Sequence, residues 1–373
     1  MIGCSDPRWL KCGGRDTVDI FDIARLAGVS RKTVQRVLND APGVRPATRD
    51  KIRRIMEQHD YEPNAAARKL AAKKTNTIGL FIVEDVRYYR LYPDDSYYGA
   101  VIGAIISACS KRDYHTLVSI HDITQVEPIM SLYRQKNIDG GIIISWSNVQ
   151  ALANRLLQAG HIVGAFDRNN VPDSPAACFV PRLDNRQGGY NATKAFIDGG
   201  HRELGIITGN SDNPAAEERL QGFLDAARDH GIRIPDAAIR TGQFTEQSGA
   251  AAVHGWVAEG TLPRAIFCSS DAIAYGALHA LRELQIRVPE DVSVIGYDDL
   301  ARSMYCLPPL TTMHVPRVEM AVWLAESLLA RIEGKSASER AAESSFGLNR
   351  SGPDSERRFE AELVVRETCT FDT

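Results

Sequence analysis

From residue 77 onward the sequence repeats one pattern, in which a short continuous apolar run is followed by a stretch with helical periodicity. Runs of four to six apolar residues suit strands that are buried on both faces. Strands that alternate with helices form parallel α/β layers, and there are too many here for one comfortable sheet, so we expect two lobes. The runs lie at 78–83, 116–120, 141–145, 162–166, 204–208, 265–268 and 292–297, and helical stretches at 99–110, 188–198, 219–230 and 272–283.

Residues 19–38 have a different pattern, typical of two short helices joined by a tight turn. Asp19 can cap a helix start, with Asp22 as its acidic partner three positions on, and apolar residues follow at helical spacing. Gly28 permits a left-handed turn conformation, and Ser30 can cap a second helix over 31–38. The segment therefore predicts a helix-turn-helix.

The second of these helices predicts one apolar face and one basic face. Val34, Val37 and Leu38 share the inward face, and a third amphipathic helix from Pro46 to about His59 can close a three-helix core. Long hydrogen-bond donors on the outer face at a helix N-terminus suit a DNA major groove. These donors are Arg31, Lys32, Gln35 and Arg36.

Charge is divided unevenly along the 373 residues, whose net charge is only -3. Residues 15–74 hold 14 Lys and Arg against 8 Asp and Glu, whereas the remainder holds 30 against 39. A basic head followed by an acidic body is compatible with binding DNA, although a solvated surface helix would explain any single basic cluster.

Composition also bears on location and redox state. No apolar run approaches bilayer length, and residues 1–15 lack the apolar core of a secretion signal, so we expect a cytoplasmic protein without a membrane partner. The seven cysteines show no close-spaced pair suited to zinc, and we interpret them as mostly buried, reduced thiols. We expect no metal and no cofactor.

Four blocks of the head resemble the LacI/GalR family in order and spacing. They are residues 22–30 (DIARLAGVS), 33–39 (TVQRVLN), 61–64 (YEPN) and 67–70 (ARKL). The resemblance implies an all-α helix-turn-helix headpiece over 18–62, preceded by an extension at 1–17 and followed by a hinge helix and linker at 63–75. The implied partner is a double-stranded DNA operator, bound by a homodimer because each head reads one half-site.

The resemblance also implies a role for each exposed residue of the head. Base contacts are implied for Arg31, Lys32 and Arg36, with Leu70 as a minor-groove wedge. Gln35 stands where the family usually has a small Ser, so it either alters a backbone contact or adds a base contact. Two alternatives stay open: Arg36 could pair with Asp40, and Leu70 could pack in a linker. Phosphate contacts are implied for Ser30, Thr33, Asn39, Tyr61 and Asn64.

The body resembles the same family at 184–189 (DNRQGG), 200–205 (GHRELG), 288–299 (VPEDVSVIGYDD) and 308–312 (PPLTT). This implies a periplasmic-binding-protein-like sensor domain over 76–373, with two parallel-sheet lobes at about 76–179 with 311–334 and 180–305 with 335–373. A small effector, expected to be a sugar or sugar derivative, would lie in the cleft beyond the carboxyl ends of the strands. The Ser-, Glu- and Arg-rich stretch at 335–358 resembles an insertion before a last strand at 359–365.

Family motif positions also indicate which side chains face the effector. Carboxylates and a guanidinium can bind paired hydroxyl groups, while an aromatic face covers the apolar side of a sugar ring. Alternatives stay open here too: Asp298 could cap a turn, Phe244 could be core, and Asp271 is expected to cap the following helix. Arg168 either favours an acidic sugar or lies on the surface. The expected effector contacts are Tyr97, Tyr98, Asp122, Asp167, Arg219, Phe244, Ser270 and Asp298.

Two other functional classes compete with a transcriptional regulator. A two-lobed cleft with Asp, Arg and His could perform chemistry on sugars, but the sequence lacks a Gly-rich phosphate loop, a metal-spaced His/Cys cluster and a nucleophile elbow. A transport receptor would share the sensor fold, but it would need an export signal and no DNA-binding head. We therefore expect a regulator, most simply a repressor, with no catalytic residues.

Overall fold

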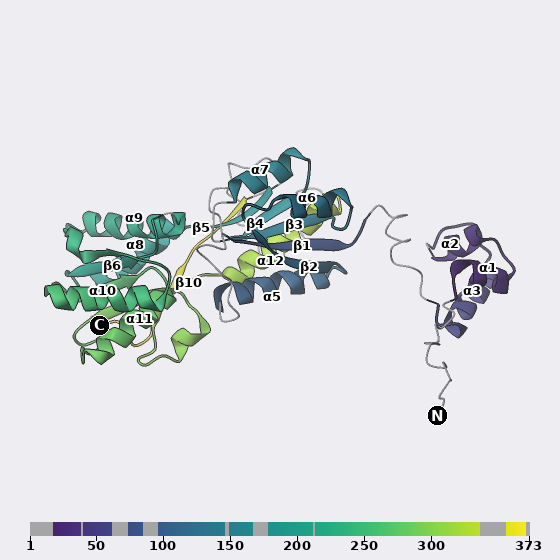
Figure 1. The fold of residues 1–373 in the computed structure, drawn as a ribbon. Helices are drawn as coiled ribbons and strands as arrows, with labels where there is room; N and C mark the ends of the chain where they lie inside the picture. Colours follow the sequence, from purple (N-terminus) through teal and green to yellow (C-terminus); the bar gives the residue numbers. More distant parts are fainter. Residues whose placement is uncertain are drawn as a thin grey trace, which may run out of the picture. The chain divides into compact units, whose positions relative to one another are not determined.

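The computed structural model describes residues 18–38, 40–61, 74–84, 96–145, 149–166, 178–211, 213–335 and 356–370 (Figure 1). It divides into two compact units, 1–75 and 76–373, and each is described here by itself. Several expectations lie outside the described residues: the extension at 1–17, nearly all of the hinge and most of the insertion. The same holds for Asn39, Asn64, Leu70, Asp167 and Arg168.

The first unit contains the three predicted helices, with the predicted signals at their ends. Asp19 and Asp22 form a reciprocal capping box, and Gly28 ends the first helix in the left-handed conformation with φ 68°. The Oγ of Ser30 accepts a hydrogen bond from the Thr33 backbone N–H at the start of the second helix. The helices are α1 Ile20–Ala27, α2 Arg31–Leu38 and α3 Pro46–Gln58.

The helices of the head close around one small apolar core. α2 contributes Val34 and Val37, as its periodicity predicts, and Leu38 is partly buried against them. Burial of these side chains is what holds helices of eight residues together, because isolated helices of this length are marginal in water. The other buried members are Ile23, Ala24, Ala27, Ile52 and Met56.

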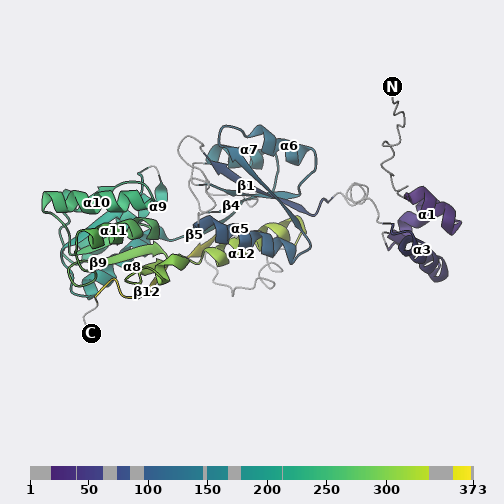
Figure 2. The same cartoon turned by 60° about the horizontal axis from the view of Figure 1, so that its bottom comes forward.

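In the second unit, the first lobe is built on a six-stranded sheet in the order β11-β5-β4-β3-β1-β2. Helices α5 and α12 cover one face, and α6 and α7 cover the other (Figures 1 and 2). The strands are β1 Thr77–Glu84, β2 His115–Asp122, β3 Gly140–Ile144, β4 Val163–Phe166, β5 Cys178–Leu183 and β11 Glu356–Phe359. The helices are α5 Ser96–Ser110, α6 Glu127–Arg134, α7 Gln150–Gln158 and α12 Arg317–Ile332.

The second lobe repeats this architecture with the strand order β12-β10-β9-β8-β6-β7, in which only the β10–β12 pair is antiparallel. Helices α8 and α9 pack on one face, and α10 and α11 pack on the other (Figure 1). The strands are β6 Leu204–Thr208, β7 Ile239–Thr241, β8 Ala265–Cys268, β9 Ser293–Asp298, β10 Thr311–His314 and β12 Glu362–Val364. The helices are α8 Asn185–Asp198, α9 Pro214–Asp229, α10 Glu246–Glu259 and α11 Asp271–Glu283, with 3-10 turns at Asp236–Ala238 and Ala301–Met304.

The expected lobe boundaries differ from the observed ones at three crossings. β5 belongs to the first sheet, so the chain crosses at Asp184 rather than near 180. β10 belongs to the second sheet, so within the expected segment 311–334 it is α12 that packs on the first. The expected last strand at 359–365 is two short strands, β11 and β12, one in each sheet. Strands of three or four residues are too short to carry a periodicity from which a sequence could place them.

β2 also differs from the expectation of a buried strand. It is an edge of the first sheet, and Leu117, Val118 and Ile120 are exposed along it, Ile120 by 60%. An exposed apolar edge strand offers unpaired backbone groups and apolar surface to another chain.

Cysteines and membrane segments can be judged within the described residues. The five cysteines there are free thiols, four of them buried and Cys306 half-buried, which agrees with the expectation for those five. Within the same residues, no helix is both long enough and apolar enough to span a bilayer.

Candidate DNA interface and effector site

The outer face of α2 presents four long hydrogen-bond donors. Arg31, Lys32, Gln35 and Arg36 are all exposed, while Val34 and Val37 between them are buried in the core. The same helix therefore fixes the backbone through one face and leaves its donors accessible on the other. This is the arrangement that reading base edges in a groove requires.

The alternative in which Arg36 pairs with Asp40 is not what the structure contains. The Asp40 carboxylate instead accepts hydrogen bonds from Arg49 at 2.8 Å and from Arg53 at 2.9 Å, both on α3. Arg49 also donates to the Ala41 carbonyl, so this pair fixes the turn after α2. Asp40 therefore pairs with two arginines of α3, and the Arg36 side chain remains exposed.

Two of the predicted phosphate contacts, Ser30 and Thr33, lie at the start of α2. Ser30 and Thr33 share a hydroxyl–hydroxyl hydrogen bond of 2.9 Å at the N-terminus of α2. Backbone N–H groups at a helix N-terminus favour anions, and hydroxyls there can bind phosphate oxygens. Tyr61 packs partly against the head core, with its backbone N–H bonded to the Met56 carbonyl.

In the second unit, Arg219 on α9 is the most constrained of the predicted effector contacts. It is 5% exposed, and its Nε donates to the Asn185 Oδ1 at 2.9 Å while an Nη donates to the Ser269 carbonyl at 2.6 Å. The guanidinium lies 3.8 Å from the ring centre of Tyr297 and 4.0 Å from the Asp298 carboxylate. The geometry thus brings together two predicted contacts, Arg219 and Asp298, at the carboxyl end of β9.

Two glycines set the position of Arg219. A Cβ on Gly222 would lie 2.0 Å from the Arg186 carbonyl oxygen, and one on Gly189 would lie 2.3 Å from the Arg219 carbonyl oxygen. α8 and α9 can therefore approach this closely only without side chains at these points. Gly188, next to Gly189, instead makes room for the Tyr297 side chain, whose hydroxyl would lie 2.2 Å from a Cβ there.

The corner after β9 carries unusual backbone geometry. Asp298 and Asp299 have φ of 116° and 53°, in the region that non-glycine residues rarely adopt. Arg317, at the start of α12 in the other lobe, donates to the Asp298 carbonyl at 2.7 Å and lies over the Tyr97 ring. A side chain of one lobe therefore holds a strained corner of the other.

The Asp299 carboxylate is held separately from that of Asp298. It accepts hydrogen bonds from Arg366 at 2.7 Å and from His314 at 2.9 Å. Burial opposes ionisation of Asp299, but the two basic partners outweigh it and lower the pKa of the carboxyl. The corner is thus fixed from several sides, which leaves Asp298 directed toward Arg219.

The start of α11 contradicts the expectation for Asp271. The helix cap is Ser270, whose hydroxyl accepts a hydrogen bond from the Ile273 N–H. Asp271 is fully buried and accepts hydrogen bonds from Ser303, Thr312 and the Leu300 N–H. Burial raises the pKa of its carboxyl to about 6, although the three hydrogen bonds act to lower it.

The remaining predicted effector contacts occupy varied positions. Tyr97 and Tyr98 are buried at the start of α5, and the Tyr98 hydroxyl donates to the Ser145 carbonyl. Asp122 ends β2 and accepts a hydrogen bond from the Thr124 N–H. Phe244 is half-buried against the core under α10 and α11, so part of its ring packs in the core, as one of the two alternatives expected.

Sequence reasoning missed several residues that shape this region. Asn185, Ser269 and Tyr297 hold Arg219, and Arg317 holds the Asp298 corner. Tyr297 lies inside the block at 288–299, but nothing in that block indicates a stacked arginine. The other three lie far apart in sequence, and only the tertiary fold brings them together.

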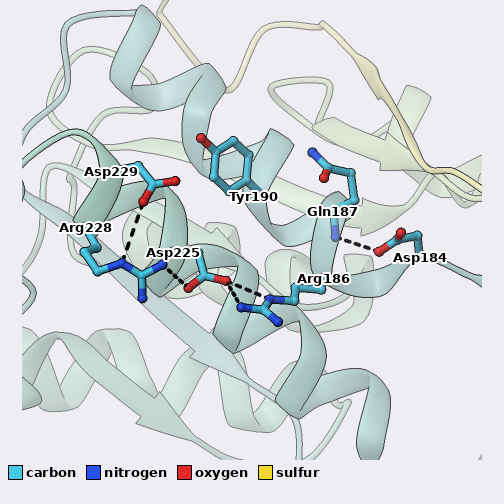
Figure 3. Close-up of a pocket in the computed structure, with 7 residues that line it drawn as sticks. All are labelled: Asp184, Arg186, Gln187, Tyr190, Asp225, Arg228 and Asp229. Carbon is cyan, nitrogen blue, oxygen red and sulfur yellow. Dashed lines mark hydrogen bonds and ion pairs between the residues drawn. The ribbon is translucent and has the colours of Figure 1, made fainter.

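A pocket of about 270 Å³ lies elsewhere on the second lobe, between α8 and α9 (Figure 3). Asp225 lies at its centre and is bridged by Arg186 and Arg228, each at 2.7 Å. Its hydrogen bond with Arg186, followed by the other ion-pair contacts, lowers the pKa of the Asp225 carboxyl. None of the predicted effector contacts lines this pocket. Arg186, Asp225, Arg228 and Asp229 form ion pairs with one another, and the Asp184 carboxylate caps α8. We interpret it as a helix-pairing network.

Comparison with protein families finds two matches. Residues 19–64 match the model of bacterial regulatory proteins of the lacI family. Residues 193–369 match the model of a periplasmic binding protein-like domain. The two matches cover the head and most of the second unit.

Individual relatives extend this match over most of the chain. The ribose operon repressor of Haemophilus influenzae is 31% identical over 84% of this chain and 91% of its own. The transcriptional regulator CelR of Thermobifida fusca is 33% identical over 84% of this chain and 91% of its own. These relatives are transcriptional regulators.

Solved structures agree with the fold. A CelR–cellobiose complex has a TM-score of 0.65 at 29% identity, covering 94% of this chain and 99% of the other. A lac repressor dimer bound to operator has a TM-score of 0.75 at 24% identity, covering 95% and 100%. The chain belongs to the lacI family of bacterial regulatory proteins, and it is a DNA-binding transcriptional regulator.

Proposed function

We propose that the chain represses transcription by reading its operator through the outer face of α2. The observation that carries this is the division of α2 into a buried face and a face with four exposed donors. Arg31, Lys32 and Arg36 contact base edges, and Gln35 adds a base or backbone contact. Ser30, Thr33 and Tyr61 bind phosphates, as do Asn39 and Asn64 outside the described residues.

Substitution of Arg36 tests this assignment. Arg36→Ala is expected to weaken binding to the operator by about 1–3 kcal/mol while binding to random DNA changes much less. The matched control is Arg54→Ala, which removes one exposed charge from α3. Gel-shift titrations on operator and random duplexes measure both variants. Equal weakening on the two DNAs would show that Arg36 touches only phosphate.

We further propose that the effector is a polyhydroxylated sugar or sugar derivative bound beside Arg219 and Asp298. A paired carboxylate and guanidinium can share the hydroxyls of a sugar, and Phe244 offers an aromatic face. Relatives give this proposal support, since one is a ribose operon repressor and another was solved with cellobiose. The remaining proposed contacts are Tyr97, Tyr98, Asp122, Ser270 and, outside the described residues, Asp167.

Thermal unfolding with ribose and cellobiose as the first probes tests this site. A ligand at 100 times its dissociation constant stabilises the native state by about 2.7 kcal/mol, which raises the unfolding midpoint. Asp298→Asn is expected to remove most of the rise without the sugar-free midpoint changing to the same extent. A rise of equal size in both proteins would place the sugar elsewhere.

We propose that the chain acts as a homodimer. The exposed apolar edge at Leu117, Val118 and Ile120 supports this, as does a second exposed group at Tyr305 and Leu307. Ile120→Lys is expected to shift the sedimentation equilibrium toward monomer, whereas Leu26→Lys, at an exposed apolar site in the head, leaves it unchanged. A wild-type monomer that binds its operator tightly at micromolar concentration would contradict the dimer.

The hinge completes the proposal. We propose that residues 65–72, which lie outside the described residues, fold as a helix when two copies meet over the minor groove, with Leu70 as the wedge. Effector binding would then change how closely the two copies approach. Leu70→Ala is expected to weaken operator binding and bending while sparing effector affinity. The protein performs this role without a catalytic step, in the cytoplasm where bacterial DNA lies.

A further inference from the structure

An exposed aromatic ring lies beneath the first residue of α2. Phe21 on α1 is 60% exposed, whereas Ile23, Ala24 and Ala27 of the same helix are buried in the head core. The guanidinium carbon of Arg31 lies 5.3 Å from the centre of the Phe21 ring, within the range of a cation–π contact. Two residues that neither stabilise the core nor cap a helix are therefore paired with each other.

The nearby carboxylates on α1 are already engaged. Asp19 and Asp22 cap the helix reciprocally, and Asp22 also forms an ion pair with Arg25. Among the described residues of the head, no carboxylate forms an ion pair with Arg31. Its contact within the head is the ring, which orients a guanidinium without neutralising its charge.

We propose that Phe21 is a positioning residue for Arg31 and so determines sequence specificity at the base that Arg31 reads. This rests on the proposed function of α2. A free arginine side chain samples many rotamers, and ordering it against a base opposes binding. Stacking on Phe21 restricts those rotamers before DNA arrives. The same side chain can then reach a guanine edge bidentately at a smaller entropic cost.

The magnitude is modest because the contact is exposed. A surface cation–π contact of this kind corresponds to about a 2- to 5-fold change in affinity for each half-site. The effect is compounded when a dimer occupies two half-sites. A loss of this size is measurable in a titration, and it is selective because it acts only at the position that Arg31 contacts.

A double-mutant cycle separates this role from a direct contact between the ring and DNA. The operator is first selected from random duplexes with the full-length wild-type chain. Binding to that operator is then titrated for Phe21→Leu, which keeps an apolar side chain without a ring, and for Phe21→Tyr, which keeps the ring. Each is also measured in an Arg31→Ala background, and Leu26→Ala, at another exposed apolar site on α1, is the matched control.

The proposal expects four results together. Phe21→Leu weakens operator binding by about 2- to 5-fold per half-site, whereas Phe21→Tyr keeps the affinity of wild type. In the Arg31→Ala background, Phe21→Leu has no further effect. The control Leu26→Ala binds like wild type. Selection with Phe21→Leu also relaxes the same base position that Arg31→Ala relaxes.

Two results would overturn it. Additive losses for Phe21→Leu and Arg31→Ala would show that the ring contacts DNA itself, and unchanged binding by Phe21→Leu would show that the stack has no role. In both cases the wild-type chain still selects an operator, so the proposed function of the head would stand. Failure of the wild-type chain to select any sequence would instead refute the proposed function of the head.

Discussion

Replacing Arg219 with alanine tests whether the predicted effector site is also a structural centre of the second lobe. The substitution removes the hydrogen bonds to Asn185 and Ser269 and the stack on Tyr297. It also leaves Asp298, 8% exposed, without the guanidinium 4.0 Å away. The variant thus retains a buried carboxylate and two buried acceptors that have lost a donor.

The expected cost follows from those three losses. Breaking a buried charged pair by removing one partner costs about 3–5 kcal/mol, much of which is the penalty of the charge left behind. Each 1 kcal/mol lowers the unfolding midpoint of a domain of this size by about 2–4 °C. We therefore expect Arg219→Ala to unfold roughly 6–20 °C below wild type.

Arg302 provides a matched control for this measurement. It also pairs with a carboxylate, that of Glu246, and lies over a ring, that of Tyr275, but its side chain is 58% exposed. Surface pairs contribute about 0–1 kcal/mol, so Arg302→Ala should unfold within about 4 °C of wild type. Thermal unfolding followed by circular dichroism measures both variants. Equal midpoints for the two would refute the structural role assigned to Arg219.

Four other substitutions test the surroundings of the site. Gly222→Ala should lower the free energy of unfolding in urea by about 1–3 kcal/mol, because a Cβ there has no room. Gly255→Ala, with open space around it, should instead raise it by about 0.5–1 kcal/mol. The reverse order would contradict the close approach of α8 and α9. The Asp271 carboxyl has a pKa of about 6 in the folded protein, against an ordinary 3.8, so it binds its proton more tightly in the native state. Its contribution to the free energy of unfolding is therefore present below about pH 4 and is lost as pH rises through 6. The unfolding midpoint of wild type relative to Asp271→Asn should therefore fall over that interval, and a constant difference would argue against the raised pKa. Arg317→Ala should speed hydrogen exchange at the amide of Asp299 and its neighbours, and unchanged exchange would show that the corner holds without Arg317.

The sequence predicted the head well because its signals are local. The Asp19–Asp22 capping box, the left-handed Gly28 and the Ser30 cap each act within a few residues, and all three occur in the structure. The apolar periodicity of α2 likewise predicted which face is buried. Local chemistry of this kind needs no knowledge of the tertiary fold.

The sensor was predicted in outline, and the misses have physical causes. β6 and β8 begin and end where their apolar runs do, because both are buried on both faces. The run at 116–120 also predicted a buried strand, but β2 lies at the sheet edge, and a short apolar run does not show which strands lie at an edge. The expected last strand at 359–365 is divided between β11 and β12, and segments of three or four residues are too short for a periodicity that would separate them.

The candidate effector site was predicted only in part. Motif positions indicated Arg219 and Asp298, which the structure brings together. Asp271 was expected to cap α11, but Ser270 beside it does so, because either residue type suits a cap and only burial separates them. Arg317 escaped notice because its role depends on a crossing between lobes.

The central claim is that the chain reads specific DNA, and one equilibrium ratio tests it most directly. The dissociation constants of the full-length chain are measured on its selected operator and on a random duplex of equal length, over a series of salt concentrations. We expect the operator to be bound at least about 10³-fold more tightly at physiological salt, with both affinities falling as salt rises. Equal affinity for the two duplexes at every salt concentration would contradict the account.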